Sequence, residues 1–361
     1  MLVQIEKCYR YCKKYKRKLY VDGSVGGFLD DFANYFISHD ANISFDKIDF
    51  LSPPFDVFPK CLYNDLYDYE IVFDKRKYIN ATKEGVFITF SFDKNYDEQI
   101  LVHAQGGGGI TGIFTLSRLS LKKDIKLHIR KTIEDLKSQS GKKSRYDAIH
   151  VRNTSVKTDY KSYFTEIKNK ISKTTVICTD DYECQQYAKA YFGQNIMSVT
   201  DIPDLSSCPV KRLEFNKHLD RYKTNVDTLT DLFILACADR VFFAPIISDC
   251  YVIINYSTYL YDPLERYIES GRKSGYQILA KNLHDNKKII SNMLYEKENS
   301  FLSYHLALLD CHFRYNSIVV RKSRTFFILL SEKGILHTFK YMIRKIIRFV
   351  SIRIKRSNHE K

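Results

Sequence analysis

The chain has 361 residues, of which 44% are apolar, 14% aromatic and 27% charged, with 14 Gly and 7 Pro. This length exceeds what one hydrophobic core usually serves and predicts two domains, and the apolar content excludes wholesale disorder or a fibrous repeat. The net charge is +15, but residues 333–361 hold nine Lys or Arg against one acid and so carry +8. The remaining +7 fits an enzyme that handles an anionic ligand, whereas a nucleic-acid binder spreads its basic excess along a binding face.

Nine Cys are scattered along the chain without a CxxC pair or the Cys/His spacing of a zinc site. They predict reduced thiols. Residues 1–18 lack the apolar core of a signal peptide, and no apolar run is long enough to span a bilayer. We therefore expect a cytoplasmic protein.

The first 140 residues have the less regular pattern. Their apolar spacing predicts helices at 5–15, 30–37, 112–121 and 124–138, and strands at 18–22, 86–92 and 100–103. A run of four glycines, Gly106–Gly109, follows the last of these strands. The polar stretch 138–144 predicts a domain boundary. It divides the chain into a first domain at 1–140, a second domain at 141–330 and a tail at 331–361.

The second half alternates apolar strands with helices. Strands are predicted at 146–152, 174–179, 196–199 and 240–244, and helices at 159–171, 181–192, 226–238 and from about Ser248. Continuous apolar strands between helices predict a parallel sheet covered on both faces. Two such α/β domains would form a pair of Rossmann-like domains facing across a cleft.

Polar side chains follow the predicted strands, where the ligand of a doubly wound sheet binds. Arg152 could clamp a phosphate through two parallel hydrogen bonds, and the carboxylates could bind hydroxyl or amine groups of a nucleotide. Together these residues predict a pocket for a nucleoside diphosphate. The candidates are His150, Arg152, Asn153, Thr154, Asp180, Asp181, Asp231 and Ser248.

Each candidate also has a structural interpretation. Arg152 at a strand end could be the partner of an ion pair. Asp180, Asp181 and Ser248 are ordinary residues for capping a helix N-terminus, and Asp231 could be a solvated carboxylate on a helix. Their occurrence together, in one order along the chain, favours the binding site.

Residues 146–259 resemble the catalytic half of the GDP-fucose-dependent fucosyltransferase superfamily, and the α1,6-fucosyltransferase pattern above all. The matching landmarks, in order, are HVRNTS at 150–155, CTDD at 178–181, DRYKTN at 220–225, Asp231, ADRVFF at 238–243 and Ser248. The chain departs from that pattern at Asn153 and Ser155, where relatives carry Arg and Asp. These departures weaken the assignment of fucose and of the linkage.

The resemblance implies an α/β fold of GT-B type, with the nucleotide sugar on the C-terminal domain and the acceptor on the N-terminal one. By similarity, Arg152 would contact the β-phosphate, and Asp231 with the His150 backbone would read the guanine. Asp180, Asp181 and Ser248 would complete the site for GDP-fucose. The family needs no metal, and the chain has no Asp-x-Asp motif. We expect no cofactor.

Deprotonation of the acceptor hydroxyl needs a general base. Asp159, seven residues after Arg152 at the head of a predicted helix, is the first candidate. A helix cap is an equal interpretation of this residue, and Asp22 and Asp30, beside a glycine-rich turn, are alternatives. The glycines at 106–109 favour a turn, or a close approach of the backbone to the acceptor.

Residues 335–356 carry an apolar helical face beside a basic one. This pattern is typical of a helix that lies on an anionic membrane surface, and it predicts a peripheral enzyme on the inner face of the plasma membrane. A helix packed on the N-terminal domain is the alternative. Together, the resemblance and the basic tail predict transfer of fucose to a surface polysaccharide, O-antigen or capsule, on an acceptor that could be lipid-linked. There are two alternatives. The enzyme could use another GDP- or UDP-sugar, or the chain could be a non-catalytic basic protein that binds RNA or membrane.

Overall fold

The computed structural model forms two compact units, residues 1–307 and 308–361. The predicted boundary at 140 remains a prediction. The residues that the structure describes are 2–24, 28–46, 52–66, 70–73, 78–81, 87–88, 90–103, 115–116, 118–141, 145–154, 157–204, 220–243, 267–270, 277–280 and 293–295.

A six-stranded sheet organises the second half of the described chain. Its strands are β10 (Asp147–Val151), β11 (Thr175–Thr179), β12 (Ile196–Met197), β13 (Arg240–Phe243), β14 (Tyr267–Ser270) and β15 (Gln277–Ala280). They lie in the order β12-β11-β10-β13-β15-β14. The first four are parallel, and β15 runs antiparallel to β13 and β14. The predicted parallel α/β sheet is thus confirmed for β10 to β13, and an antiparallel pair extends it.

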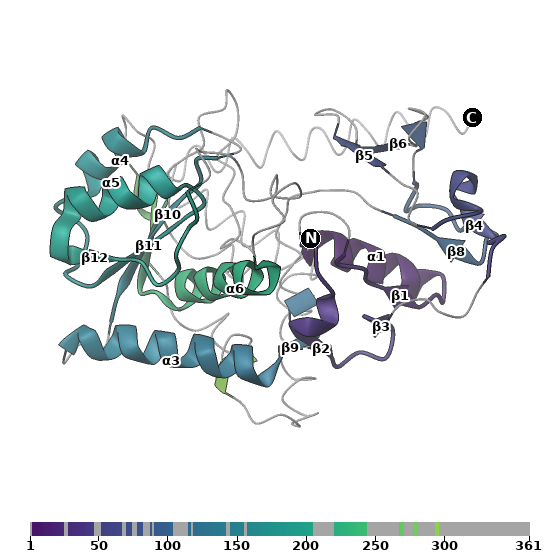
Figure 1. Cartoon of the computed structure of the whole chain (residues 1–361), viewed down its shortest axis with the longest axis horizontal. Coiled ribbons are helices and arrows are strands. Elements are labelled where there is room, and N and C mark those ends of the chain that lie inside the picture. The colour runs from purple at the N-terminus through teal and green to yellow at the C-terminus, as the bar shows by residue number, and fades with distance from the viewer. Residues whose placement is uncertain are drawn as a thin grey trace, which may run out of the picture. The chain divides into compact units, whose positions relative to one another are not determined.

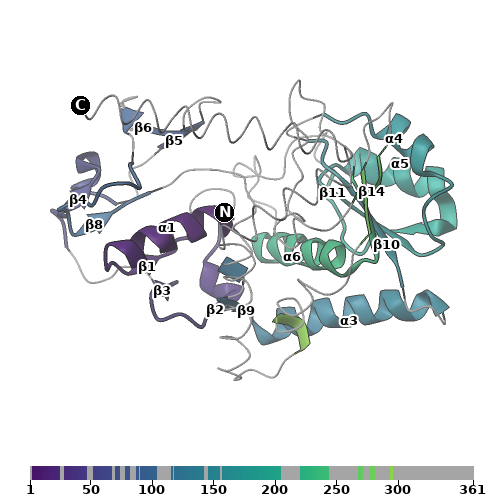
Figure 2. The ribbon, with the colours of Figure 1, turned by 180° about the vertical axis from the view of Figure 1, so that it is seen from behind.

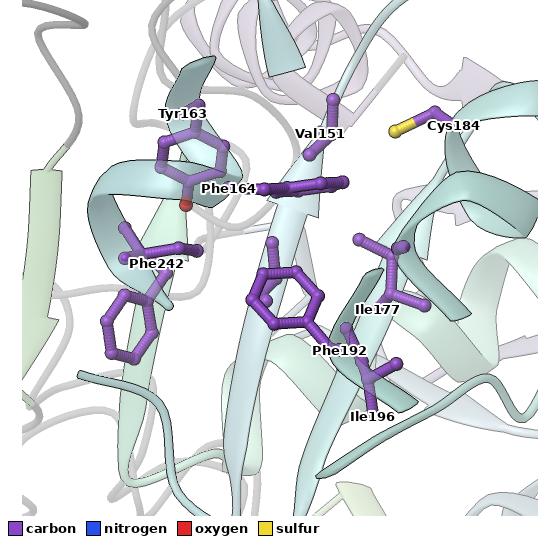
Figure 3. Packing of buried hydrophobic residues seen from close by; sticks show 11 residues of the cluster. Val151, Tyr163, Phe164, Ile177, Cys184, Phe192, Ile196 and Phe242 are labelled. Atoms are coloured by element: carbon purple, nitrogen blue, oxygen red, sulfur yellow. The ribbon is translucent and has the colours of Figure 1, made fainter. Parts of the chain in front are cut away.

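Helices cover both faces of this sheet, as the unbroken apolar strands predict. In Figures 1 and 2, α4 (Tyr160–Ile167) and α5 (Tyr182–Phe192) lie over one face, and α3 (Lys123–Gln139) and α6 (Arg221–Cys237) over the other. Side chains alternate between the two faces along a strand. Val151 and Ile177 pack with Phe164 of α4 and Phe192 of α5 (Figure 3). His150 and Cys178 therefore lie on the α6 side.

Helix α6 begins earlier in the chain than predicted, because Asp220 caps its N-terminus. The Asp220 side chain accepts a hydrogen bond from the backbone N–H of Lys223 at 2.9 Å, which caps the helix. The helix consequently begins at Arg221, five residues before the expected start at 226. The helix predicted at 159–171 is shorter in the structure, where α4 ends at Ile167.

The N-terminal half forms small sheets. Three of them have two strands each, and one has three: β1–β3, β2–β9, β4–β8 and β5-β6-β7. Within the ranges given above, these residues build no second doubly wound sheet, and the twin-Rossmann GT-B arrangement remains a prediction. The elements are α1 (Leu2–Lys14), β1 (Leu19–Tyr20), η1 (Phe32–Asn34), β2 (Phe36–Ser38), β3 (Ile43–Ser44), β4 (Val57–Phe58), η2 (Lys60–Leu62), β5 (Glu70–Phe73), β6 (Tyr78–Ala81), β7 (Phe87–Ile88), β8 (Ile100–Leu101) and β9 (Leu119–Leu121), with η4 (Gly193–Asn195) in the second half.

One predicted helix is wrong, and another is wrong at its end. The helix expected at 30–37 is a single 3₁₀ turn, η1, followed by strand β2. Phe32, Tyr35 and Phe36 have the spacing of a helix face and are all buried, but β2 instead pairs antiparallel with β9. The same pairing makes a strand of residues 119–121, where the end of a helix was expected. Contacts between distant segments thus override the local period.

None of the described helices combines the length and apolar character needed to cross a bilayer. The predicted amphipathic helix at 335–356 lies outside the described residues.

Candidate functional site

The carboxyl ends of β10 and β11 lie next to each other. The parallel register pairs His150 with Cys178 and Val151 with Thr179. Arg152 is the first residue after β10 and is half-buried, and Asp180 is the first after β11. The fold therefore places two of the predicted strand-end groups at one edge of the sheet, as predicted for a ligand site.

Asp180 ties the two loops together. Its Oδ1 accepts hydrogen bonds from the backbone N–H of Asn153 at 2.7 Å and of Thr154 at 3.3 Å. Its Oδ2 accepts one from the Thr154 hydroxyl at 2.6 Å. Three donors thus hold one carboxylate. Asp180 and Thr154 shape the loop after β10.

Asn153 and Thr158 complete this loop. The Asn153 amide donates to Asp181 Oδ2 at 2.5 Å, and its Oδ1 accepts from the Thr158 backbone N–H at 2.9 Å. The Thr158 hydroxyl donates to the carbonyl of Arg152 at 2.7 Å. Asp181 is also the N-cap of α5, through the N–H of Cys184 at 3.3 Å. The structure thus gives Asn153 and Asp181, predicted as donor-binding residues, contacts that fix the backbone around Arg152.

His150 lies on β10 and is 9% exposed. Its burial, chiefly, and the nearby positive charge of Arg152 lower its pKa to about 4, although the Asp180 carboxylate opposes the shift. The imidazole is therefore neutral at physiological pH. The pairing of β10 with β11 makes His150, Arg152 and Asp180 neighbours at this edge of the sheet.

Asp231 approaches the same sheet from α6. Its Oδ1 accepts a hydrogen bond from the Thr200 hydroxyl at 3.0 Å, and Cys178 lies near the same carboxyl group. Part of residue 231 remains exposed, but burial of the carboxyl raises its pKa to about 7. The neighbouring charge of Asp227 acts in the same direction, while the interactions with Thr200 and Cys178 oppose it. Asp231 therefore changes its charge near neutral pH.

Asp159 is the N-cap of α4. The side chain is exposed and accepts the backbone N–H of Ser162 at 3.2 Å. Hydrogen bonds from Ser162 hold the pKa of Asp159 below its ordinary value. The carboxylate is thus ionised at neutral pH, and the structure shows the capping role that the sequence left as an alternative.

The two other base candidates bond locally. Asp22 accepts from the backbone N–H and the hydroxyl of Ser24, at 2.8 and 2.6 Å. Asp30 accepts from the Asn34 amide at 3.1 Å and from the hydroxyl of buried Tyr35. Asp30 is therefore part of a packed network instead of an open carboxylate.

The first turns of α6 contact the N-terminal half. The Asn225 amide donates to the carbonyl of Phe28 at 2.9 Å and to the Tyr35 hydroxyl at 3.1 Å. The Tyr222 hydroxyl donates to Asp124 of α3 at 2.7 Å. The DRYKTN segment thus supplies side chains that join α6 to residues far away in the sequence.

Sequence reasoning did not single out Thr158 or Thr200, and it named Cys178 merely as part of a landmark. Hydroxyl residues in loops carry no local signal for a partner 31 residues away, as Thr200 has in Asp231. The described residues hold no cluster of three His, Cys, Asp or Glu side chains that could bind a metal ion. Ser248 and the glycines at 106–109 fall outside the described ranges.

No protein-family model and no curated protein matches this sequence. Among solved structures, the chain resembles the selenomethionine form of the fucosyltransferase NodZ from Bradyrhizobium, at 14% identity and a TM-score of 0.45. The match covers 69% of this chain and 92% of that one. A likeness of this size leaves the activity to be argued from the residues themselves.

Proposed function

We propose that the protein is a glycosyltransferase that moves fucose from GDP-fucose to a hydroxyl of a surface-polysaccharide intermediate, with inversion. The observation that carries the proposal is the meeting of His150, Arg152 and Asp180 at the carboxyl edge of a parallel sheet, where Asp180 fixes the loop after Arg152. The motif order along residues 146–259 supports the nucleotide-sugar donor.

Arg152 stabilises the leaving group in this proposal. Sugar transfer from a nucleoside diphosphate develops negative charge on the departing diphosphate, while the sugar becomes cationic. A guanidinium held in place before the reaction lowers the energy of this state without having to reorganise. The Thr158 hydroxyl donates to the Arg152 carbonyl, and the backbone N–H groups of Asn153 and Thr154 donate to Asp180, so the backbone that carries this guanidinium is fixed.

Asp231 and the His150 backbone bind the base. Guanine presents an N1–H and a 2-amino group as neighbouring donors, and an ionised carboxylate accepts both. Asp231 lies on the α6 side of the sheet, the face on which His150 and Cys178 also lie. We assign Asp180, Asp181, Asn153 and Thr154 to the walls of the site, and Ser248 to the phosphates by resemblance.

A donor panel tests the function. The protein is incubated with GDP-fucose, GDP-mannose and UDP-glucose, and release of the nucleoside diphosphate is measured together with saturable GDP binding. Hydrolysis of GDP-fucose above the other two supports the proposal. Preference for another nucleotide sugar would keep the enzyme class and change the donor. Salt-sensitive RNA binding without affinity for GDP would replace the proposal with a binding protein.

EDTA is expected to leave turnover unchanged. The proposed charge on the diphosphate is met by Arg152, so no step requires a divalent ion. The measurement is the rate of GDP-fucose hydrolysis in excess EDTA, against the same protein supplied with Mg²⁺ or Mn²⁺. A rate that collapses with EDTA and returns with the metal would contradict metal independence.

GDP affinity is expected to fall with acidity through the pKa of Asp231, about 7. If the base binds the ionised carboxylate alone, affinity is about tenfold weaker at pH 6 than at pH 8 and levels off above pH 8. The groups around Asp231 are Thr200, Cys178 and Asp227, and His150 titrates far below this window, at about 4. The measurement is calorimetric titration from pH 5.5 to 8.5.

The phosphates of GDP also titrate near pH 6. Asp231→Asn provides the control, because it removes the carboxylate and leaves the contribution of the ligand. A wild-type profile that overlays that of Asp231→Asn would exclude Asp231 from the binding equilibrium.

The acceptor and the membrane remain part of the proposal. The excess charge of +8 in residues 333–361 suits an anionic bilayer, on which a lipid-linked acceptor would be presented at the inner face of the membrane. Sedimentation with anionic vesicles, compared with zwitterionic ones, tests the association. Equal recovery with both would count against it.

A further inference from the structure

We infer that Thr200 is a positioning residue that orients the Asp231 carboxylate toward the base of the donor nucleotide. Thr200 is not part of the proposed donor site. The inference rests on the proposed function, since it gives Asp231 a guanine to read. It identifies one side chain, which follows strand β12, as a determinant of base specificity.

Thr200 is itself held in place. It follows β12 and is 5% exposed, and its carbonyl accepts a hydrogen bond from the Gln185 amide of α5 at 3.0 Å. Its hydroxyl donates to Asp231 Oδ1 at 3.0 Å. Because Gln185 is also buried, the hydroxyl is anchored to the body of the domain. The Thr200 bond therefore fixes one oxygen of the carboxylate.

Cys178 is a neighbour of the same carboxyl group. It lies one residue before the end of β11 and is 2% exposed. Burial, chiefly, and the nearby Asp231 carboxylate raise the pKa of its thiol well above its ordinary value, so the thiol stays uncharged. The bond from Thr200 is thus the contact that restricts rotation of a side chain that α6 supplies.

This restriction matters for reading a base. Each carboxylate oxygen can accept more than one hydrogen bond, so a bond from Thr200 to Oδ1 does not exhaust the group. Two oxygens match the N1–H and the 2-amino group of guanine if the carboxylate plane is correct. Inosine diphosphate has the first donor and lacks the second, and it reports on this alignment.

The test compares Thr200→Val with Thr200→Ser. The valine keeps the shape of the side chain and removes the donor, whereas serine restores it. Thr230→Val is the matched control, because Thr230 neighbours Asp231 on α6 but bonds to the carbonyl of Val226 at 2.8 Å within its own helix. Affinity for GDP and for inosine diphosphate is measured by calorimetry at pH 8, and the midpoint of the pH dependence for GDP is measured as well.

Thr200→Val is expected to weaken GDP binding about tenfold, because a hydrogen bond to a charged group is lost. It should also reduce the preference for GDP over inosine diphosphate and move the pH midpoint upward, since this bond favours the ionised carboxylate. Thr200→Ser should restore all three values.

Two failures can be told apart. Wild-type protein without saturable GDP binding would overturn the proposed function. Wild-type protein that binds GDP, with Thr200→Val behaving as Thr230→Val does in preference and midpoint, would overturn the positioning role alone. Thermal unfolding of each variant shows whether it is folded. If Thr200→Val does not fold, Thr200→Ala decides, because it also removes the hydroxyl donor and an unchanged midpoint in it would reject the inference.

Discussion

Replacing Arg152 with Ala is expected to reduce donor turnover by about 10²–10³-fold, the usual cost of removing a group that stabilises transition-state charge. GDP affinity should fall as well, because the guanidinium also meets the ground-state diphosphate. The measurements are GDP-fucose hydrolysis and GDP titration. Arg152→Lys should fall between wild type and Arg152→Ala, since Lys keeps the charge and loses the paired hydrogen bonds.

Arg145→Ala is the matched control. Arg145 lies just before the amino end of β10, the strand that Arg152 follows, and its side chain is exposed. Its Nε lies 3.8 Å from Oδ1 of Asp239. Because a doubly wound sheet binds its ligand at the opposite edge, this variant should retain wild-type turnover and affinity. Equal losses in Arg145→Ala and Arg152→Ala would indicate a general effect of net charge. Unchanged turnover in Arg152→Ala would remove the basis of the proposed function.

Asp159→Asn is expected to lower kcat about 10²-fold with GDP affinity unchanged. We propose Asp159 as the proton acceptor, and Asn cannot take a proton from the acceptor hydroxyl. Since hydrogen bonds from Ser162 hold the pKa of Asp159 below its ordinary value, it is a weaker base. This places the effect at the low end of about 10²–10⁴-fold. The measurement is transfer under saturating donor.

Asn caps a helix about as well as Asp, so Asp159→Asn should leave the thermal midpoint nearly unchanged, whereas Asp159→Ala should cost about 1 kcal/mol of unfolding free energy. Asp220→Asn is the control, because Asp220 makes the equivalent cap on α6 through the Lys223 N–H. Full turnover in Asp159→Asn would assign Asp159 to capping alone.

The strand-end motif shows how far sequence reasoning reaches within the site. It correctly places Arg152 and Asp180 at the ends of two strands, because each follows a short apolar run, and the pairing of β10 with β11 makes these ends neighbours. It does not show that Asp180 holds the backbone of Asn153 and Thr154. A carboxylate at a strand end looks the same in sequence whether its partner is a ligand or the neighbouring loop.

The sequence by itself determined the local elements of the nucleotide-binding half. Short buried runs such as Asp147–Val151 favour strands covered on both faces, and Asp181 starts a helix through contacts within four residues. Tertiary structure decided the rest. Pairing with β9 turned residues 36–38 into a strand, and packing of α6 brought Asp231 to Thr200, 31 residues away. Such contacts depend on distances in space that no local period encodes.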